Sequence, residues 1–222
     1  MTKIEEFEKG LIKNGITEND YSEYDNLLKR VHGNFLRLRH CCTTAVQFPE
    51  KHAEQAIDLI EWGLEKYPDT WFSAYSAYCD IGMINERCGK YRSAYEAYLK
   101  AAEVLSEDQL SYRKMISGNL LWMLLHADGF KYSGQLETYY DLFKEIGDFE
   151  KAFINNEFRL AVAEIVIFSH KGMKDKAAGS YERAIKLSKP NVISRAQGVL
   201  DKHNVKDTLK NTSECAAFLK NI

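Results

Sequence analysis

Apolar residues recur along most of this chain at intervals of three and four positions, the spacing that places them on one face of an α-helix. The first such stretch predicts a helix that opens at Thr2, because Thr2 and Glu5 have the spacing of a capping box. Asn14 and Gly15 predict its end. The apolar positions of this helix are Ile4, Phe7, Leu11 and Ile12.

Thr17 and Asp20 predict the start of a second, longer helix that ends before Pro49. Gly33 lies inside its pattern, where it would permit a kink or a close contact. Pro49 suits the first turn of the next helix, which is expected to run to about Tyr67. The apolar positions of the second helix include Tyr24, Leu27, Leu28, Val31, Phe35 and Leu36.

The remaining chain continues as helices separated by short turns. Turns are predicted at Cys88-Gly89-Lys90 and at Lys171-Gly172-Met173, and Pro190 ends the last strongly patterned stretch. The predicted helices after residue 105 cover Leu110 to Leu125, Gly134 to Ile146, Phe149 to Phe168, Val192 to His203 and Lys206 to Lys220, and a further helix through Ala177, Tyr181 and Ala184 ends before Pro190. The chain is therefore predicted to be all-α.

Two amphipathic helices meet at the turn Cys88-Gly89-Lys90, and small and aromatic residues alternate on their facing sides. The positions concerned are Tyr78, Ile81, Gly82, Ala94, Tyr98 and Ala101. Small residues allow two helices to approach closely, and the tyrosines fill the space beside them. This stretch resembles one unit of the tetratricopeptide repeat family, W-x2-L-G-x2-Y followed by A-x3-F, with Tyr78 in the Trp place. Asn85 stands where the pattern has a second aromatic residue, which is a departure.

The second-helix offsets recur elsewhere in the chain. Ala177, Tyr181 and Ala184 repeat them closely, and Ala56, Ile60 and Gly63 repeat them ahead of Pro68. Gly134, Thr138 and Asp141 match by spacing alone. The resemblance covers residues 37–190 and implies a right-handed array of antiparallel helix pairs, a TPR-like α-solenoid, with N-terminal helices before it and capping helices over 191–222. Another kind of helical-hairpin array is the alternative.

Composition narrows the partners this protein is expected to have. The chain has 222 residues, a length that suits one domain spanning 1–222. Its formal charge of −2 provides no basic field for nucleic acid or for an anionic membrane. The N-terminal MTKIEEFEKG has no apolar core of a signal peptide, and no stretch approaches the roughly 18 apolar residues of a membrane span. Five cysteines without CxxC spacing are typical of reduced thiols, so a cytoplasmic location is expected.

Motifs of catalysis and metal binding are missing from the sequence. It has no HExxH, Walker loop, GxSxG or EF-hand loop, and no two histidines lie four residues apart on a helix. We therefore expect no enzyme activity, no cofactor and no metal. An enzyme that uses His126 or His170 together with Glu86 is the alternative. The aromatics Trp71, Phe72, Tyr75 and Tyr78 are expected in the core, with an exposed ligand platform as the other interpretation.

The resemblance also implies a binding groove lined by the first helix of each pair. The corresponding positions in this sequence are Cys41, Cys79, Met83, Glu86, Arg87, Asn119, Met123, His126, Arg159, Val162, Val166 and His170, with Leu38 a further equivalent in the first pair. Arg87 and Arg159 are expected to project into the groove from different repeats. Cys79 with Met83 and Val162 with Val166 replace the Lys and Asn that some family members use to hold a terminal carboxylate, so that clamp is not expected.

These patterns favour a non-catalytic protein–protein interaction scaffold. Its size and the lack of another domain suggest a dedicated inhibitor, such as the immunity protein of a bacterial toxin, with the cognate toxin as partner. A general TPR adaptor or regulatory protein is the alternative.

Overall fold

The computed structural model describes residues 2–126, 134–146 and 154–187, and in these ranges every regular element is helical. The helices are α1 (Lys3–Asn14), α2 (Glu18–Leu28), α3 (Asn34–Ala45), the 3-10 helix η1 (Glu50–His52), α4 (Ala53–Lys66), α5 (Trp71–Arg87), α6 (Tyr91–Glu103), α7 (Leu110–His126), α8 (Gly134–Phe143), α10 (Ile154–His170) and α11 (Lys174–Leu187). The all-α prediction is confirmed for the described residues. The two capping helices predicted after Pro190 lie outside them.

The chain divides into two compact units, residues 1–108 and 109–222, and each is described by itself. Unit 1 holds α1 to α6, and unit 2 holds α7, α8, α10 and α11. In both units the most extensive packing joins helices that follow each other in the chain: α3 with α4, α5 with α6, α7 with α8, and α10 with α11. These are the helix pairs that the sequence predicts. Whether the chain acts as a single domain stays a prediction.

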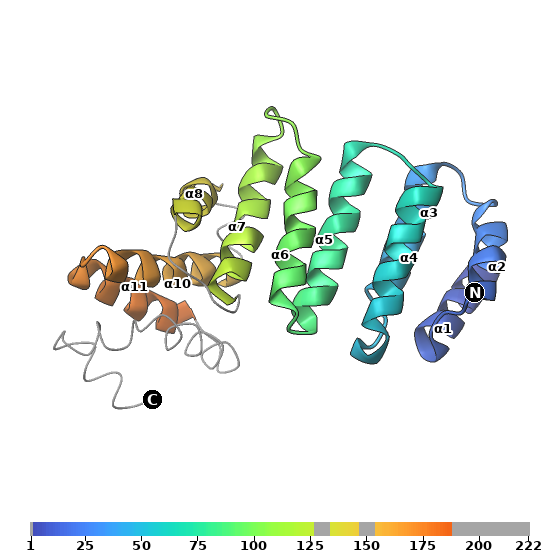
Figure 1. The fold of residues 1–222 in the computed structure, drawn as a ribbon, viewed down its shortest axis with the longest axis horizontal. Coiled ribbons are helices and arrows are strands. Elements are labelled where there is room, and N and C mark those ends of the chain that lie inside the picture. Colours follow the sequence, from blue (N-terminus) through green and yellow to red (C-terminus); the bar gives the residue numbers. More distant parts are fainter. Residues whose placement is uncertain (1, 127–133, 147–153, 188–222) are drawn as a thin grey trace. The chain divides into compact units, whose positions relative to one another are not determined.

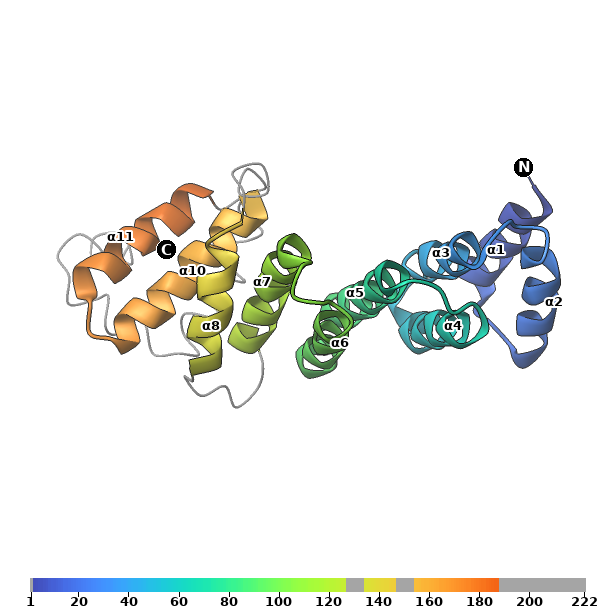
Figure 2. The same cartoon turned by 90° about the horizontal axis from the view of Figure 1, so that it is seen from above.

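Unit 1 has two rows of helices. Viewed along their axes, α3 and α5 lie on one side and α4 and α6 on the other (Figure 2). α3 packs against α5 as well as against α4, so the first helices of the two pairs are neighbours (Figure 1). The core of unit 1 contains the fully buried Tyr24, Leu28, Leu38, Leu59 and Ile60.

Local signals at the helix ends act as the sequence predicts. The Thr2 backbone N–H donates to Glu5 Oε2 at 2.8 Å, and the Glu5 N–H donates to Thr2 Oγ1 at 3.2 Å. Gly89 and Gly172, in the two predicted turns, have φ of 70° and 71°. Glycine adopts this left-handed region without the steric penalty that a Cβ brings, so both turns depend on it.

One helix prediction is wrong. The pattern predicts a single helix from Thr17 until before Pro49, but α2 ends at Leu28 and α3 begins at Asn34. Gly33 has φ 86°, which no residue of a right-handed helix adopts. Arg37 Nε donates to the Val31 carbonyl at 3.1 Å and so satisfies a backbone group in the segment between the helices. The break separates α2 from α3, and both pack into the core of unit 1 through buried leucines.

Candidate functional site

A hollow of about 310 Å³ lies between α3 and α5, entirely within unit 1. Its lining residues follow one face of each helix, with intervals of three and four on α3. They are Phe35, Leu38, Arg39 and Cys42 from α3, and Phe72, Ser73 and Ser76 from α5. The hollow is thus formed where the first helices of two successive pairs pack side by side.

We call this cavity the α3–α5 hollow. Aromatic rings form its mouth. Phe35 is 42% exposed and Phe72 is 37% exposed, and their ring centroids lie 6.5 Å apart at an interplanar angle of 23°. Trp71, 38% exposed, meets Phe72 edge-on at 5.7 Å. The expectation that Trp71 and Phe72 are core residues is wrong, whereas Tyr75 is buried as predicted. Large exposed apolar groups that gather beside a hollow are typical of a binding surface.

One cation, Arg39, lines the hollow. Its Nη1 lies 3.4 Å from Ser76 Oγ and 4.0 Å from the Asp80 carboxylate. The Arg39 side chain is 53% exposed, whereas that of Asp80 is only 17% exposed. Burial raises the pKa of Asp80, and the positive charge of Arg39 opposes that rise. The long Arg39–Asp80 separation indicates a weak ion pair.

The floor of the hollow is chemically inert. Burial raises the pKa of the Cys42 thiol to about 12, so at neutral pH it stays protonated and is a poor nucleophile. The same cause raises the pKa of Cys79 to about 12. Among the residues that the structure describes, no group of three or more His, Cys, Asp or Glu could hold a metal ion. The arrangement is equipped to bind, through apolar contact and one cation.

The residues that the sequence assigns to the groove in unit 1 have different environments. Cys41 is fully buried beneath α4, where a Cβ on Gly63 would approach its side chain at 3.0 Å. Met83 is 47% exposed. Glu86 accepts a hydrogen bond from Tyr98 Oη at 3.2 Å. Cys79 and Glu86 are partly exposed, and Arg87 is exposed. Of the groove positions assigned in unit 1, only Leu38 lines the hollow itself.

Arg87 binds the protein backbone. Its Nη1 donates to the Val46 carbonyl at 2.9 Å, and its Nη2 donates to the Phe48 carbonyl at 2.8 Å. Both carbonyls belong to the segment that joins α3 to η1. The guanidinium therefore ties the C-terminal end of α5 to the connection between the preceding helices, a role that the sequence does not predict.

In unit 2 the structure brings several of the predicted residues together around Trp122. Arg159 Nη1 donates to Asn119 Oδ1 at 2.8 Å, and the guanidinium lies over the Trp122 ring at 5.5 Å. The ring of His126 lies 4.3 Å from that of Trp122, and its Nδ1 lies 2.8 Å from the Trp122 carbonyl oxygen. Trp122 itself is buried.

The other predicted residues of unit 2 do not join this cluster. Met123, Val162 and Val166 are at most 4% exposed and belong to the core. They present almost no surface to a partner, as is also true of Cys41. His170 is exposed at the end of α10. The alternative that pairs His126 or His170 with Glu86 joins residues of different units and stays a prediction.

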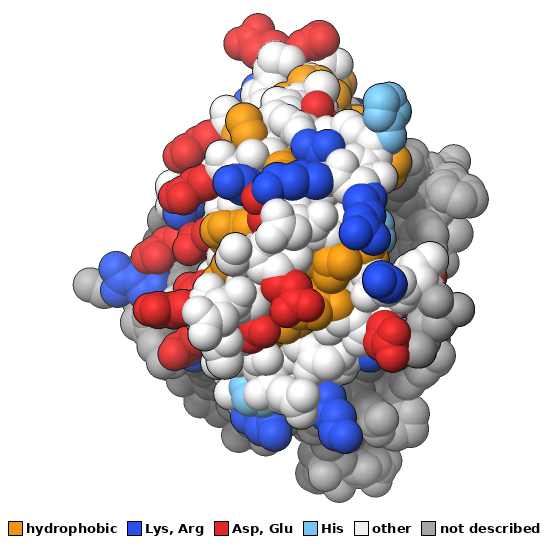
Figure 3. Space-filling view, turned by 90° about the vertical axis from the view of Figure 1, so that its right-hand side faces the viewer, with side chains coloured by type: hydrophobic (Ala, Val, Ile, Leu, Met, Phe, Trp, Pro, Cys, Tyr) orange, Lys and Arg blue, Asp and Glu red, His pale blue; other side chains and the backbone are white. Residues whose placement is uncertain are grey.

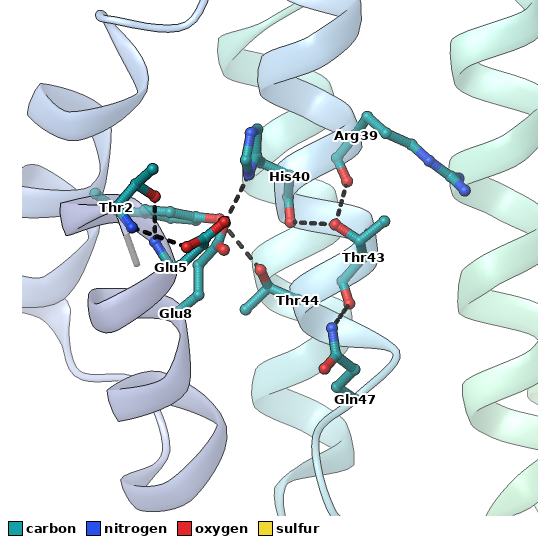
Figure 4. Close-up of polar contacts among 9 residues, drawn as sticks. Thr2, Glu5, Glu8, Arg39, His40, Thr43, Thr44 and Gln47 are labelled. Carbon is teal, nitrogen blue, oxygen red and sulfur yellow. Dashed lines mark hydrogen bonds and ion pairs between the residues drawn. The ribbon is translucent and has the colours of Figure 1, made fainter.

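A polar network that no sequence pattern predicts joins α1, α2 and α3 (Figure 4). His40 Nδ1 lies 2.8 Å from Glu8 Oε1, Tyr24 Oη donates to the same oxygen at 2.6 Å, and Tyr24 Oη lies 3.3 Å from Thr44 Oγ1. Burial raises the pKa of Glu8, but the hydrogen bonds from His40 and Tyr24 outweigh it and lower the pKa overall. The hydrogen bond to Glu8 raises the pKa of His40. Glu8 and His40 are 32 residues apart, so no local pattern reveals the pair.

A second hollow, between α1 and α2, is less suited to a specific ligand. Its rim carries charges of both signs, from Lys3, Glu6, Asp20 and Glu23. Figure 3 shows this end of unit 1, where acidic side chains gather along one edge and basic and apolar ones are interspersed. Such a mixture is that of an ordinary solvated surface.

Comparison with models of known protein families, with curated proteins and with solved structures found no match. None of the described helices combines the length and the apolar character that crossing a membrane requires.

Proposed function

We propose that this chain is a TPR-like helical-repeat protein that binds another protein and catalyses no reaction. The packing of α3 with α4, α5 with α6, α7 with α8, and α10 with α11 supports this proposal, as does a close glycine–ring contact within two of these pairs. In the proposed arrangement each pair is antiparallel and the pairs stack as a right-handed array. The first helices of successive pairs then line a common face.

The observation that carries the proposal is the α3–α5 hollow. Phe35 and Phe72 remain more than a third exposed beside it, although burial of a phenylalanine side chain stabilises a protein by about 1.5–3 kcal/mol. A partner that covers these rings would recover the part of that stabilisation that belongs to their exposed surface. Aromatic and arginine side chains are also the residues enriched at the energetic centres of protein interfaces, and Arg39 lies in the same hollow.

The partner class that we propose is a single cognate protein, with the chain acting as its dedicated inhibitor in the cytoplasm, as an immunity protein acts on a toxin. Affinity purification from the native host tests this against the adaptor alternative. Recovery of one enzyme in equal stoichiometry supports the inhibitor, and addition of the purified chain should then suppress that enzyme's activity. Recovery of many unrelated partners supports a general adaptor.

Matched variants decide whether the α3–α5 hollow is the binding surface. Phe35 and Leu36 are neighbours in the first turn of α3 and are 42% and 47% exposed, but only Phe35 lines the hollow. Phe35→Ser is expected to weaken binding of the purified partner by about tenfold or more. Leu36→Ser is expected to weaken this binding much less. Equal effects of the two substitutions would contradict the assignment of this surface.

A further inference from the structure

The size of the α3–α5 hollow suits one anchoring side chain. Its volume of about 310 Å³ is at the lower end for pockets that hold a whole small-molecule ligand, which begin near 300 Å³. The aromatic mouth and the buried Leu38 beneath it favour a large apolar or aromatic group. A partner would therefore insert a single side chain here and make its other contacts around the rim.

Arg39 adds a charge requirement at the wall of the hollow. Among the described residues, the Arg39 guanidinium contacts the side chains of Ser76 and Asp80, and both contacts involve Nη1. The donors on Nε and Nη2 form the edge of the guanidinium that accepts a carboxylate in a two-point, planar arrangement. With its side chain 53% exposed, Arg39 can present this edge to a partner.

Asp80 restricts where that carboxylate can lie. Its own carboxylate is near Nη1, so an incoming acid at that side would be repelled. The partner's carboxylate is thus directed to the opposite edge of the guanidinium.

We propose that the α3–α5 hollow recognises an internal segment of the partner that carries a large apolar side chain and, on the same side, an Asp or Glu carboxylate. This inference rests on the proposed function and specifies the chemistry of the partner. In an extended segment alternate side chains point to the same side, so the simplest matching sequence is an aromatic residue and an acidic residue separated by one other. The apolar group enters the hollow and the carboxylate binds Arg39.

Three end-blocked peptides test the proposal on the full chain. The first is acetyl-Gly-Phe-Gly-Glu-Gly-amide. The second has Gln in place of its Glu, and the third has Ala in place of its Phe. Backbone amide shifts in an NMR titration report both affinity and location. The Phe/Glu peptide is expected to bind with a dissociation constant in the millimolar range and to shift amides of α3 and α5. The Gln and Ala counterparts should each bind at least about fivefold more weakly, which corresponds to loss of one recognition element.

Two arginine variants separate the role of Arg39 from a general effect of charge. Arg39→Gln should bind the Glu and Gln peptides equally, while its remaining affinity for both shows that the hollow is intact. Arg92→Gln removes a cation whose side chain is 90% exposed on α6, and it should leave the preference for Glu unchanged. Loss of the preference in both variants would overturn the assignment to Arg39.

Each other outcome also decides the question. Equal binding of the Glu and Gln peptides to the unchanged chain would overturn the carboxylate requirement, and equal binding of the Phe and Ala peptides would overturn the apolar anchor. If no peptide binds although Phe35→Ser weakens binding of the purified partner, this inference fails while the proposed function stands. If sedimentation shows dimers that Phe35→Ser disperses, a second copy of the chain occupies the hollow and the inference is overturned.

Discussion

Gly82 of α5 lies directly against the ring of Tyr98 of α6. A Cβ placed on Gly82 would be 2.5 Å from Tyr98 Cε1, closer than real Cβ contacts occur. The same kind of glycine–ring contact recurs in unit 2, where a Cβ on Gly118 of α7 would lie 2.4 Å from the ring of Phe143 of α8. In both pairs a glycine on the first helix lets an aromatic ring of the second pack against the backbone.

Gly82→Ala is therefore expected to destabilise unit 1, by about 1–3 kcal/mol, because the rigid Tyr98 ring has to shift to admit a methyl group. Gly10→Ala is the matched control, since Gly10 is also inside a helix but has nothing within 4 Å of its Cβ position. Gly10→Ala should stabilise by about 0.5–1 kcal/mol through the backbone entropy of the unfolded chain. Urea unfolding of both variants measures the two effects. Equal effects of the same sign would contradict the close Gly82–Tyr98 contact.

The Glu8–His40 pair should make the stability of unit 1 depend on pH. The raised pKa of His40 contributes stability that is fully present below its unfolded value, near 6.5, and is lost as pH rises through the folded value. The lowered pKa of Glu8 contributes stability that is present above its unfolded value of 4.5 and is lost as pH falls through the folded value. The pair therefore stabilises most between these two unfolded values.

His40→Gln tests this dependence. The loss of melting temperature relative to the unchanged chain should be larger near pH 5.5 than near pH 8.5, because the imidazolium form of His40 is more populated at the lower pH. His32→Gln, which replaces an exposed histidine, serves as the control and should show a small effect at both values. A His40→Gln deficit that stays constant with pH would show that the pair acts only through neutral hydrogen bonds.

Glu164 joins three helices of unit 2. Its carboxylate accepts hydrogen bonds from Tyr140 Oη on α8 at 3.0 Å, and from Ser180 Oγ and Arg183 Nη2 on α11 at 2.6 Å each. Its side chain is only 14% exposed, so Glu164→Ala leaves part-buried donors without this acceptor and should cost about 2–3 kcal/mol. Hydrogen exchange of α8, α10 and α11 should accelerate together. Glu182→Ala, at an exposed position beside Arg183, should leave the exchange unchanged.

Arg87 should matter for folding. Removal of its two hydrogen bonds to the Val46 and Phe48 carbonyls by Arg87→Ala is expected to cost about 1–2 kcal/mol. Arg87→Lys should restore little, because an ammonium group lacks the fork that reaches both carbonyls. The control Arg92→Ala should change stability by less than about 0.5 kcal/mol. Unaltered melting of Arg87→Ala with weakened partner binding would instead support the groove position inferred from the sequence.

Helix ends and turns could be predicted from the sequence because their causes are local. The Thr2–Glu5 capping box acts within one turn, and Gly89 and Gly172 adopt a conformation that side chains disfavour in any context. The Gly82–Tyr98 contact could also be predicted from the sequence, because small and aromatic residues alternate on two helices joined by a short turn. The Gly118–Phe143 contact could not be predicted, because the spacing in α8 assigns the second-helix offsets to Gly134, Thr138 and Asp141 and not to Phe143.

Only the tertiary structure decided which apolar residues remain exposed. Periodicity identifies the apolar side of a helix but does not say whether a neighbour covers it, so Trp71 and Phe72 appear equivalent to the core residue Tyr75. The same reason hides the Glu8–His40 pair and the contacts of Arg87, whose partners lie 32 to 41 residues away in the chain. Local chemistry therefore determined the helix ends that carry a capping box or a glycine turn, but it did not reveal the break between α2 and α3. The surface available for binding was decided by the packing of α3 against α5, because exposure depends on which helices meet.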